Sequence, residues 1–236
     1  MNDILRLIHE RHSSRGRFDP ERSIKKDELK MIIEAARWAP SAHNMQNFEI
    51  IVIDDKEIIK AIGQIESTIF EEFIRENFKQ LSMSEEELKR KKTGILGTQF
   101  PKKWTDASKL DEAVKERRPT SLDHTTRGGN TILLVIYDER KRAPASEGDF
   151  WGILSLGCVM ENIWLVAQSL GISVHIMSAF EGIYEELKKM LEIPDYMEYG
   201  FALKLGYPVS EKKYLRVRRD IESFTHHNKY GDKWLG

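Results

Sequence analysis

Residues 35–53 read AARWAPSAHNMQNFEIIVI, and this stretch holds a helix end, a polar loop and a strand in succession. The helix must end near Ala39, because Pro40 disfavours helical geometry in the residue before it. The loop at 41–47 is polar. The run Phe48–Ile53 is rich in β-branched residues and predicts a strand.

Apolar patterns on both sides of this stretch predict the rest of the fold. Upstream, helical spacing predicts one helix over Asp3–Glu10 and a second that begins after Asp27 as its N-cap. Downstream, the pattern predicts strand, helix, strand, helix and strand at 131–137, 150–170, 172–177, 181–191 and 199–205. This order predicts a mixed β-sheet layered with helices.

Composition limits the class of protein. The 236 residues carry 37 Lys+Arg against 38 Asp+Glu, a formal net charge of −1, which argues against bulk nucleic-acid binding. The single cysteine, Cys158, suits a reducing compartment, and the first residues lack the pattern of a secretory signal. We therefore expect a cytoplasmic protein.

The apolar run at 150–171 has nearly the length of a membrane span. It is interrupted by Glu161, Asn162 and Gln168, which a membrane span tolerates poorly. The run therefore predicts a buried central helix, with a dimer interface as the place for so much apolar surface, and no membrane partner.

Residues 56–125 differ in character from the rest. They are helical in pattern and highly charged, and they predict a lid-like helical insert within a single domain that spans 1–236. Five aromatic residues could roof a planar substrate: Phe70, Phe73, Phe78, Phe100 and Trp104. The alternatives are a solvated excursion without a role, and phenylalanines that only pack the insert onto the core.

The segment RHSSR at 11–15 is a candidate phosphate site. In an extended chain, side chains alternate, so Arg11, Ser13 and Arg15 face one side. Two guanidinium groups and a hydroxyl suit a phosphate dianion. The alternative is a solvated basic turn.

Two other segments carry groups of interest. The loop after Pro40 offers Ser41, Asn44 and Gln46, whose donors and acceptors suit the edge of a flat heteroaromatic ring. Near the C-terminus, the last residues are polar, and Arg216 and Arg218 lie on the same side of the chain if these residues form an extended arm. An ordinary capped loop and a solvated tail are the alternatives.

Taken together, these motifs resemble the FMN-dependent nitroreductase family. The family has an R-x-S-x-R segment after its first helix, then a helix ending in A-x-x-A-P-S-x-x-N-x-Q before a strand; RHSSR at 11–15 and the stretch 35–53 match both. The apolar helix ENIWLVAQSLGIS at 161–173, LGYP at 205–208, Arg-Arg at 218–219 and the ending at 227–231 extend the resemblance over nearly the whole chain except 56–125.

The resemblance implies an α+β fold, with a central mixed β-sheet flanked by helices and an extended C-terminal arm, in a domain-swapped homodimer with FMN at each of two interface sites. It assigns the phosphate and ribityl chain to Arg11, His12, Ser13 and Arg15, with Arg218 or Arg219 as a further cation. It assigns contacts with the isoalloxazine ring or ribityl chain, made from the partner subunit, to Pro40, Ser41, Ala42, Asn44 and Gln46. It assigns the lining of the flavin ring, largely through backbone groups, to Met177, Ser178 and Ala179.

The chain departs from the family pattern at two places. Asn47 stands where family members usually have proline after the glutamine, and the glycine that many members carry near 178–179 is absent. The first difference bears on the rigidity of the loop, and the second on how closely the backbone approaches the flavin.

The implied reaction is a hydride transfer from NADH or NADPH through flavin N5 to a small planar, electron-poor acceptor, such as a nitroaromatic, a quinone or a flavin, in ping-pong order. The flavin supplies the chemistry, so we assign no catalytic side chain and no metal. Two alternatives stay open: reductive dehalogenation of an aromatic amino acid or other flavin chemistry on the same scaffold, and a non-enzymatic FMN-binding protein.

Overall fold

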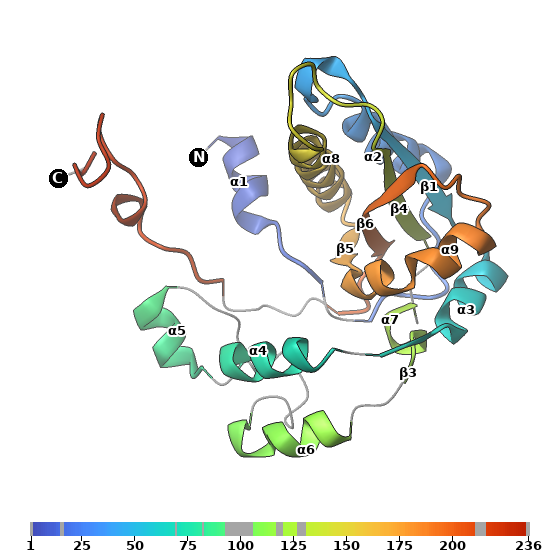
Figure 1. The fold of residues 1–236 in the computed structure, drawn as a ribbon, viewed down its shortest axis with the longest axis horizontal. Coiled ribbons are helices and arrows are strands. Elements are labelled where there is room, and N and C mark those ends of the chain that lie inside the picture. The colour runs from blue at the N-terminus through green and yellow to red at the C-terminus, as the bar shows by residue number, and fades with distance from the viewer. Residues whose placement is uncertain are drawn as a thin grey trace. The chain divides into compact units, whose positions relative to one another are not determined.

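The structure, a computed structural model, describes residues 2–14, 17–68, 70–81, 83–92, 106–116, 120–126, 131–210 and 216–234. The chain forms two compact units, residues 1–67 with 120–212 and residues 68–119 with 213–236. The elements of the first unit (Figure 1) are α1 (Asp3–Glu10), α2 (Lys26–Arg37), η1 (Ala42–Asn44), β1 (Phe48–Ile53), α3 (Lys56–Gln64), β2 (Glu66–Ser67), β3 (Thr120–Ser121), α7 (Asp123–Thr126), β4 (Thr131–Asp138), α8 (Phe150–Ser169), β5 (Ser173–Ile176), η5 (Ser178–Ile183), α9 (Tyr184–Met190) and β6 (Met197–Gly206).

The main sheet has the strand order β1-β4-β6-β5, and each described pair of neighbours is antiparallel. The prediction of a mixed sheet is therefore wrong. Helix α8 returns the chain so that β4 and β5 run in the same direction, as in a parallel unit. However, β6 lies between these two strands and pairs with both, so parallel strands are never neighbours.

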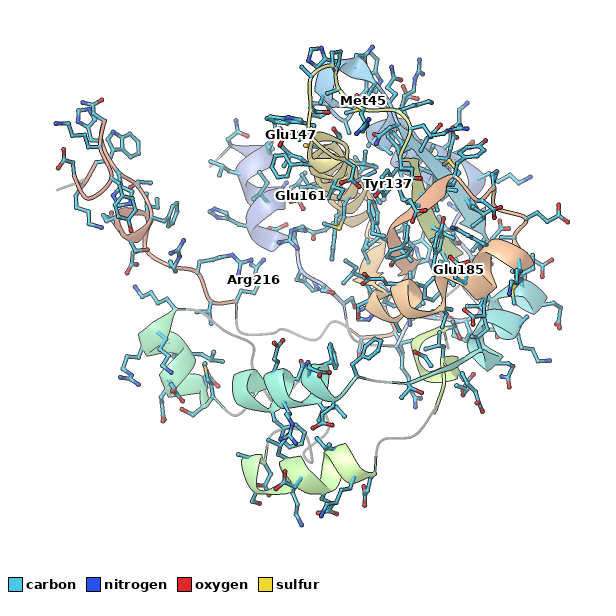
Figure 2. The ribbon with its side chains drawn as sticks, in the orientation of Figure 1. Met45, Tyr137, Glu147, Glu161, Glu185 and Arg216 are labelled. Atoms are coloured by element: carbon cyan, nitrogen blue, oxygen red, sulfur yellow. The ribbon has the colours of Figure 1, made fainter. Side chains whose placement is uncertain are left out.

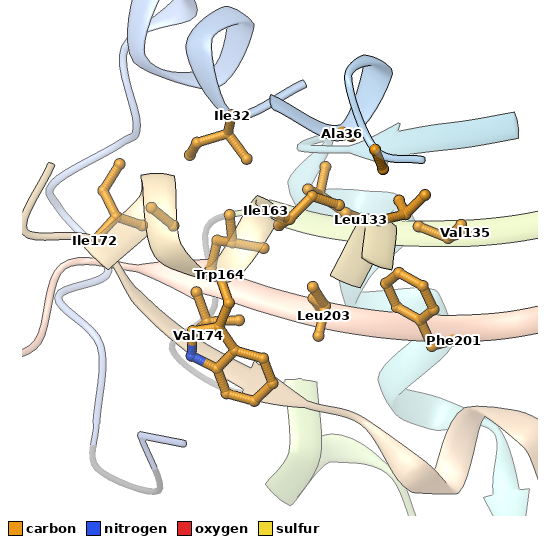
Figure 3. Packing of buried hydrophobic residues seen from close by; sticks show 14 of the residues in the cluster. Ile32, Ala36, Leu133, Val135, Ile163, Trp164, Ile172, Val174, Phe201 and Leu203 are labelled. Atoms are coloured by element: carbon orange, nitrogen blue, oxygen red, sulfur yellow. The ribbon is translucent and has the colours of Figure 1, made fainter. Parts of the chain in front are cut away.

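Strand β4 is buried along its whole length because both faces of the sheet are covered. Its odd-numbered residues Leu133, Val135 and Tyr137 pack with α2 and α8. Figure 3 shows this packing, in which Ile32 and Ala36 of α2 face the sheet alongside the α8 side chains. The alternation expected of a strand thus places one apolar layer on each face.

The opposite face carries a second apolar layer. The even-numbered residues Ile132, Leu134 and Ile136 of β4 pack with α3, η5 and α9. Strand β6 has a bulge where the register shifts between Val135 and Ile136, opposite Gly200. A Cβ atom on Gly200 would lie 2.7 Å from the Val135 carbonyl oxygen, so the bulge requires glycine.

Helix α8 is the one helix, among the residues that the structure describes, that is long and apolar enough to cross a membrane by length and composition. Buried core helices pass the same test. One face of α8 packs on the sheet and α2, as predicted. The other face of its first half exposes four large apolar side chains, Phe150, Trp151, Ile153 and Leu154.

Most predicted helix and strand positions are confirmed, but the start of α2 is not. The N-cap is Lys25, two residues before the predicted Asp27. The Glu28 carboxylate accepts a hydrogen bond from the Lys25 backbone N–H at 3.1 Å, which satisfies that donor at the helix start. Asp27 lies within the first turn, where its charge favours the helix dipole.

The second unit contains α4 (Glu71–Leu81), α5 (Glu85–Lys91), η4 (Ala107–Lys109), α6 (Leu110–Lys115) and η6 (Ile221–Ser223). Among its described residues, Ile74, Phe78 and Leu88 are buried apolar side chains. Phe70 and Phe73 are exposed. The Lys92 ammonium binds the Asp220 carboxylate at 2.6 Å and connects α5 to the C-terminal arm. The predicted Phe100 and Trp104 lie outside the described residues.

Candidate functional site

The segment after α1 runs along the edge of the sheet formed by β5. The Ser14 N–H donates to the Val174 carbonyl at 2.8 Å. The indole N–H of Trp164 on α8 donates to the His12 carbonyl at 3.1 Å. These two bonds hold the backbone of residues 12–14 against β5 and α8. That the side chains of Arg11, Ser13 and Arg15 face one side stays a prediction.

Arg11 and Ser13 offer a cation and a hydroxyl on this edge. The Arg11 guanidinium lies 5.1 Å from the ring centroid of Trp164, and its Nε is 3.4 Å from Glu161 Oε1. Figure 2 labels Glu161 on α8. The Ser13 hydroxyl oxygen is buried and has no hydrogen-bond partner among the described residues. Buried hydroxyl groups normally have a partner, so this atom fits a ligand acceptor such as a phosphate oxygen.

The segment Met177–Ala179 continues from the same strand. The Met177 N–H bonds inward to the Ala202 carbonyl at 2.9 Å, whereas Val174 bonds outward to Ser14. Ser178 and Ala179 begin η5, and the first N–H groups of a helix have no acceptor within it. They are therefore suited to bind a ring edge through the backbone.

The side chain of Tyr199 on β6 lies next to Met177 in this segment. Its hydroxyl lies 3.5 Å from the Met177 carbonyl oxygen, at the limit of a hydrogen bond. Burial raises the pKa of Tyr199 above its ordinary value, so the hydroxyl keeps its proton. The structure thus brings Arg11, Ser13 and the 177–179 segment to one edge of the sheet.

The loop Pro40–Gln46 lies elsewhere in the same chain. The Ala42 N–H donates to the Ser155 hydroxyl at 3.2 Å, in the first half of α8, whereas the 11–14 segment is held at Trp164. Nine residues of helix separate these anchors, a distance of about 14 Å. Figure 2 labels Met45 at the loop. In one chain the two predicted groups of flavin contacts are therefore anchored on different halves of α8.

Arg15, Arg218 and Arg219 are the other predicted phosphate contacts. Arg15 lies outside the described residues. Arg218 and Arg219 belong to the second unit, where Arg218 donates to the Val217 carbonyl at 2.7 Å and the Arg219 guanidinium lies 5.3 Å from the Phe224 ring centroid. Their contact with a phosphate stays a prediction.

Three residues of α8 were not identified from the sequence. Glu161 and Trp164 both contact Arg11, and Ser155 accepts the hydrogen bond from the loop. Their helical spacing gives a weak signal, because polar residues in an apolar helix must meet a partner when they are buried. The sequence alone did not say which partner.

The chain is similar to known proteins over nearly its whole length. The model of the Nitroreductase family matches residues 8–207. The NADPH-dependent oxidoreductase of Staphylococcus aureus (strain bovine RF122 / ET3-1) is 21% identical over 231 residues, which cover 98% of this chain and 75% of that protein.

Solved structures show the same fold. A nitroreductase with bound FMN from Bacteroides fragilis NCTC 9343 has a TM-score of 0.60 at 19% identity, over 95% of this chain and 98% of that one. A nitroreductase with bound FMN from Desulfitobacterium hafniense DCB-2 has a TM-score of 0.57 at 23% identity, over 97% and 100%.

The family match covers most of the chain, which therefore belongs to the nitroreductase family. The predicted enzyme class, an FMN-dependent oxidoreductase of the nitroreductase type, is confirmed by this membership and by the names of the relatives.

Proposed function

We propose that this protein binds FMN at the edge of β5 and uses NADH or NADPH to reduce a small, electron-poor acceptor such as a nitroaromatic, a quinone or a flavin. The observation that carries the proposal is the buried Ser13 hydroxyl without a partner among the described residues, in the same segment as Arg11 and at the edge where the backbone of 177–179 is also available. Family membership supports the same cofactor.

The chain's own groups have distinct tasks in this proposal. The Arg11 guanidinium and the Ser13 hydroxyl bind the phosphate, with Arg15 and Arg218 or Arg219 as further cations. Backbone N–H groups at Ser178 and Ala179 orient the ring. FMN, when bound there, would supply the hydride chemistry between the nicotinamide donor and the acceptor, while the residues of the chain hold and orient it. No side chain need act as acid or base.

The same proposal includes a homodimer. The loop Pro40–Gln46 and the 11–14 segment are about 14 Å apart along α8, so a site that uses both draws one of them from a second copy. The exposed apolar faces of α1 (Ile4, Leu5, Ile8) and of the first half of α8 support such an interface. The arm, which exposes Phe224, Tyr230 and Trp234, would exchange between the two copies.

We also propose that the predicted lid-like insert at 56–125 covers the bound acceptor with its part at 68–119, because 56–67 and 120–125 belong to the first unit. Phe70 directly precedes α4 and Phe73 lies in its first turn, and both side chains are exposed. An aromatic surface of this kind suits a planar substrate. A closed lid would keep water from the reduced cofactor.

The visible spectrum of the purified protein tests the proposal, with NADH or NADPH then added without oxygen. A flavin spectrum that bleaches supports the reductase. A flavin spectrum that persists with both donors favours the dehalogenase or the non-enzymatic FMN-binding protein. A protein that remains colourless after FMN is added and excess ligand is removed contradicts the proposed cofactor site.

A further inference from the structure

The loop at 41–47 has an unusual backbone conformation. His43, Asn44 and Gln46 have φ values of 50°, 52° and 41°, in the left-handed region that residues other than glycine rarely adopt. Each such residue costs free energy, and the conformation persists only where its surroundings determine it. The contacts that hold this loop are therefore informative.

Some of these contacts lie within the loop. The Gln46 N–H donates to the Ser41 hydroxyl at 3.1 Å, and the Gln46 side-chain amide donates to Asn44 Oδ1 at 3.1 Å. Asn44 and Gln46 are exposed, so their amide groups lie at the surface with their relative orientation fixed. This closed set of bonds shapes the loop but does not attach it to the fold.

Two contacts attach the loop to α8. The Ala42 N–H donates to the Ser155 hydroxyl, which itself donates to the Trp151 carbonyl at 2.7 Å. Asn47 is 2% exposed and lies directly against Gly152, where a Cβ atom would be 2.7 Å from its Nδ2. Gly152 and Ser155 are three residues apart and thus on one face of the helix.

We propose that Gly152 and Ser155 are positioning residues for the cofactor: they hold the loop so that Asn44 and Gln46 present their amide groups to the flavin. This inference rests on the proposed FMN site. It also explains why Asn47 is tolerated where the family usually has proline. The buried contact of Asn47 with Gly152 fixes the loop end that proline would fix by its ring.

Ser155→Ala tests the first contact, with Ser169→Ala as a matched control. Ser169 is also a serine of α8 whose hydroxyl bonds a carbonyl of its own helix, Val166 at 2.8 Å, but it is exposed and distant from the loop. We expect Ser155→Ala to raise the FMN dissociation constant about fivefold, as for loss of one hydrogen bond. Ser169→Ala should leave it unchanged.

Two further readouts separate positioning from general loss of stability. Amide hydrogen exchange at Ala42 in the cofactor-free protein should be faster in Ser155→Ala than in Ser169→Ala, while the melting temperatures of the two variants agree. Equal FMN dissociation constants in the parent and Ser155→Ala would overturn the inference and leave the proposed function intact. A parent that binds no FMN would overturn both.

Gly152→Ala tests the second contact independently. The added methyl group must displace the Asn47 side chain, so FMN binding should weaken about tenfold or more. The double variant Asn47→Ala/Gly152→Ala removes the clash, and we expect it to bind FMN more tightly than Gly152→Ala alone. Additive losses in the double variant would refute the role of this contact.

Discussion

Ser13→Ala should change the stability of the protein in opposite directions with and without FMN. The hydroxyl oxygen is buried with no partner among the described residues, and an unsatisfied buried polar group costs about 1–3 kcal/mol. Ser13 itself is half-buried, so we take the low end. Removing the hydroxyl should raise the free energy of unfolding of the cofactor-free protein by about 1 kcal/mol, or about 2–4 °C in melting temperature.

With FMN the order should reverse. Loss of a hydrogen bond to a charged phosphate costs about 1.5–3 kcal/mol, which raises the dissociation constant about 10- to 150-fold. At an FMN concentration 100 times its own dissociation constant, the parent gains about 2.7 kcal/mol of stability. At the same concentration the variant gains no more than about 1.4 kcal/mol.

Thermal unfolding of both proteins, with and without FMN, measures these terms directly. The variant should melt above the parent without FMN and below it with FMN. A variant that keeps the parent's FMN affinity would refute the assignment of Ser13 to the phosphate. A variant that loses stability without FMN would show that the hydroxyl has a structural partner.

Four further variants test the cofactor site and the sheet. Arg11→Ala should raise the FMN dissociation constant about 10- to 150-fold. Glu161→Gln removes the carboxylate that lies 3.4 Å from the Arg11 side chain, so it should lower this dissociation constant about two- to fivefold. Fluorescence titration of the cofactor-free protein with FMN measures both values. Gly200→Ala places a methyl group 2.7 Å from the Val135 carbonyl oxygen and should lower the free energy of unfolding in urea by about 1–3 kcal/mol, and an unchanged midpoint would contradict the bulge geometry. Burial lowers the pKa of Lys204 to about 8, below about 10.4 in the unfolded chain, so this group binds more protons in the unfolded chain between these values, and the parent should gain stability relative to Lys204→Met as pH rises from about 8 to 10. Lys204→Met should lose that rise, which urea unfolding at both pH values would detect.

Local features of the chain could be predicted because their causes are local. Helix α1 and strand β1 have the predicted bounds, and Gly171 has the positive φ of a helix end. Pro40 and the β-branched run at 48–53 act on neighbouring residues, so the sequence contains the whole cause. The predicted start of α2 is wrong because Glu28 satisfies the Lys25 N–H from within the helix, so the helix begins at Lys26 without a side-chain cap from Asp27.

The candidate site could be predicted as a set of residues but not as a place. RHSSR and the 41–47 loop were identifiable because their side-chain types suit a phosphate and a ring edge. Their anchors on α8, Trp164 and Ser155, lie more than a hundred residues away in sequence, and no local pattern gives such a pairing.

The sequence by itself determined where the helices and strands lie, which face of each is apolar, and which residues could hold an anionic cofactor, because these follow from periodicity and side-chain chemistry. The tertiary structure alone decided that the sheet is antiparallel, since β6 enters between β4 and β5. It also decided that the 11–14 segment and the 41–47 loop bind opposite halves of α8. The strand order and the two anchors on α8 both depend on burying the apolar layers on the two faces of the sheet at the same time. This burial brings together residues that are far apart in the chain.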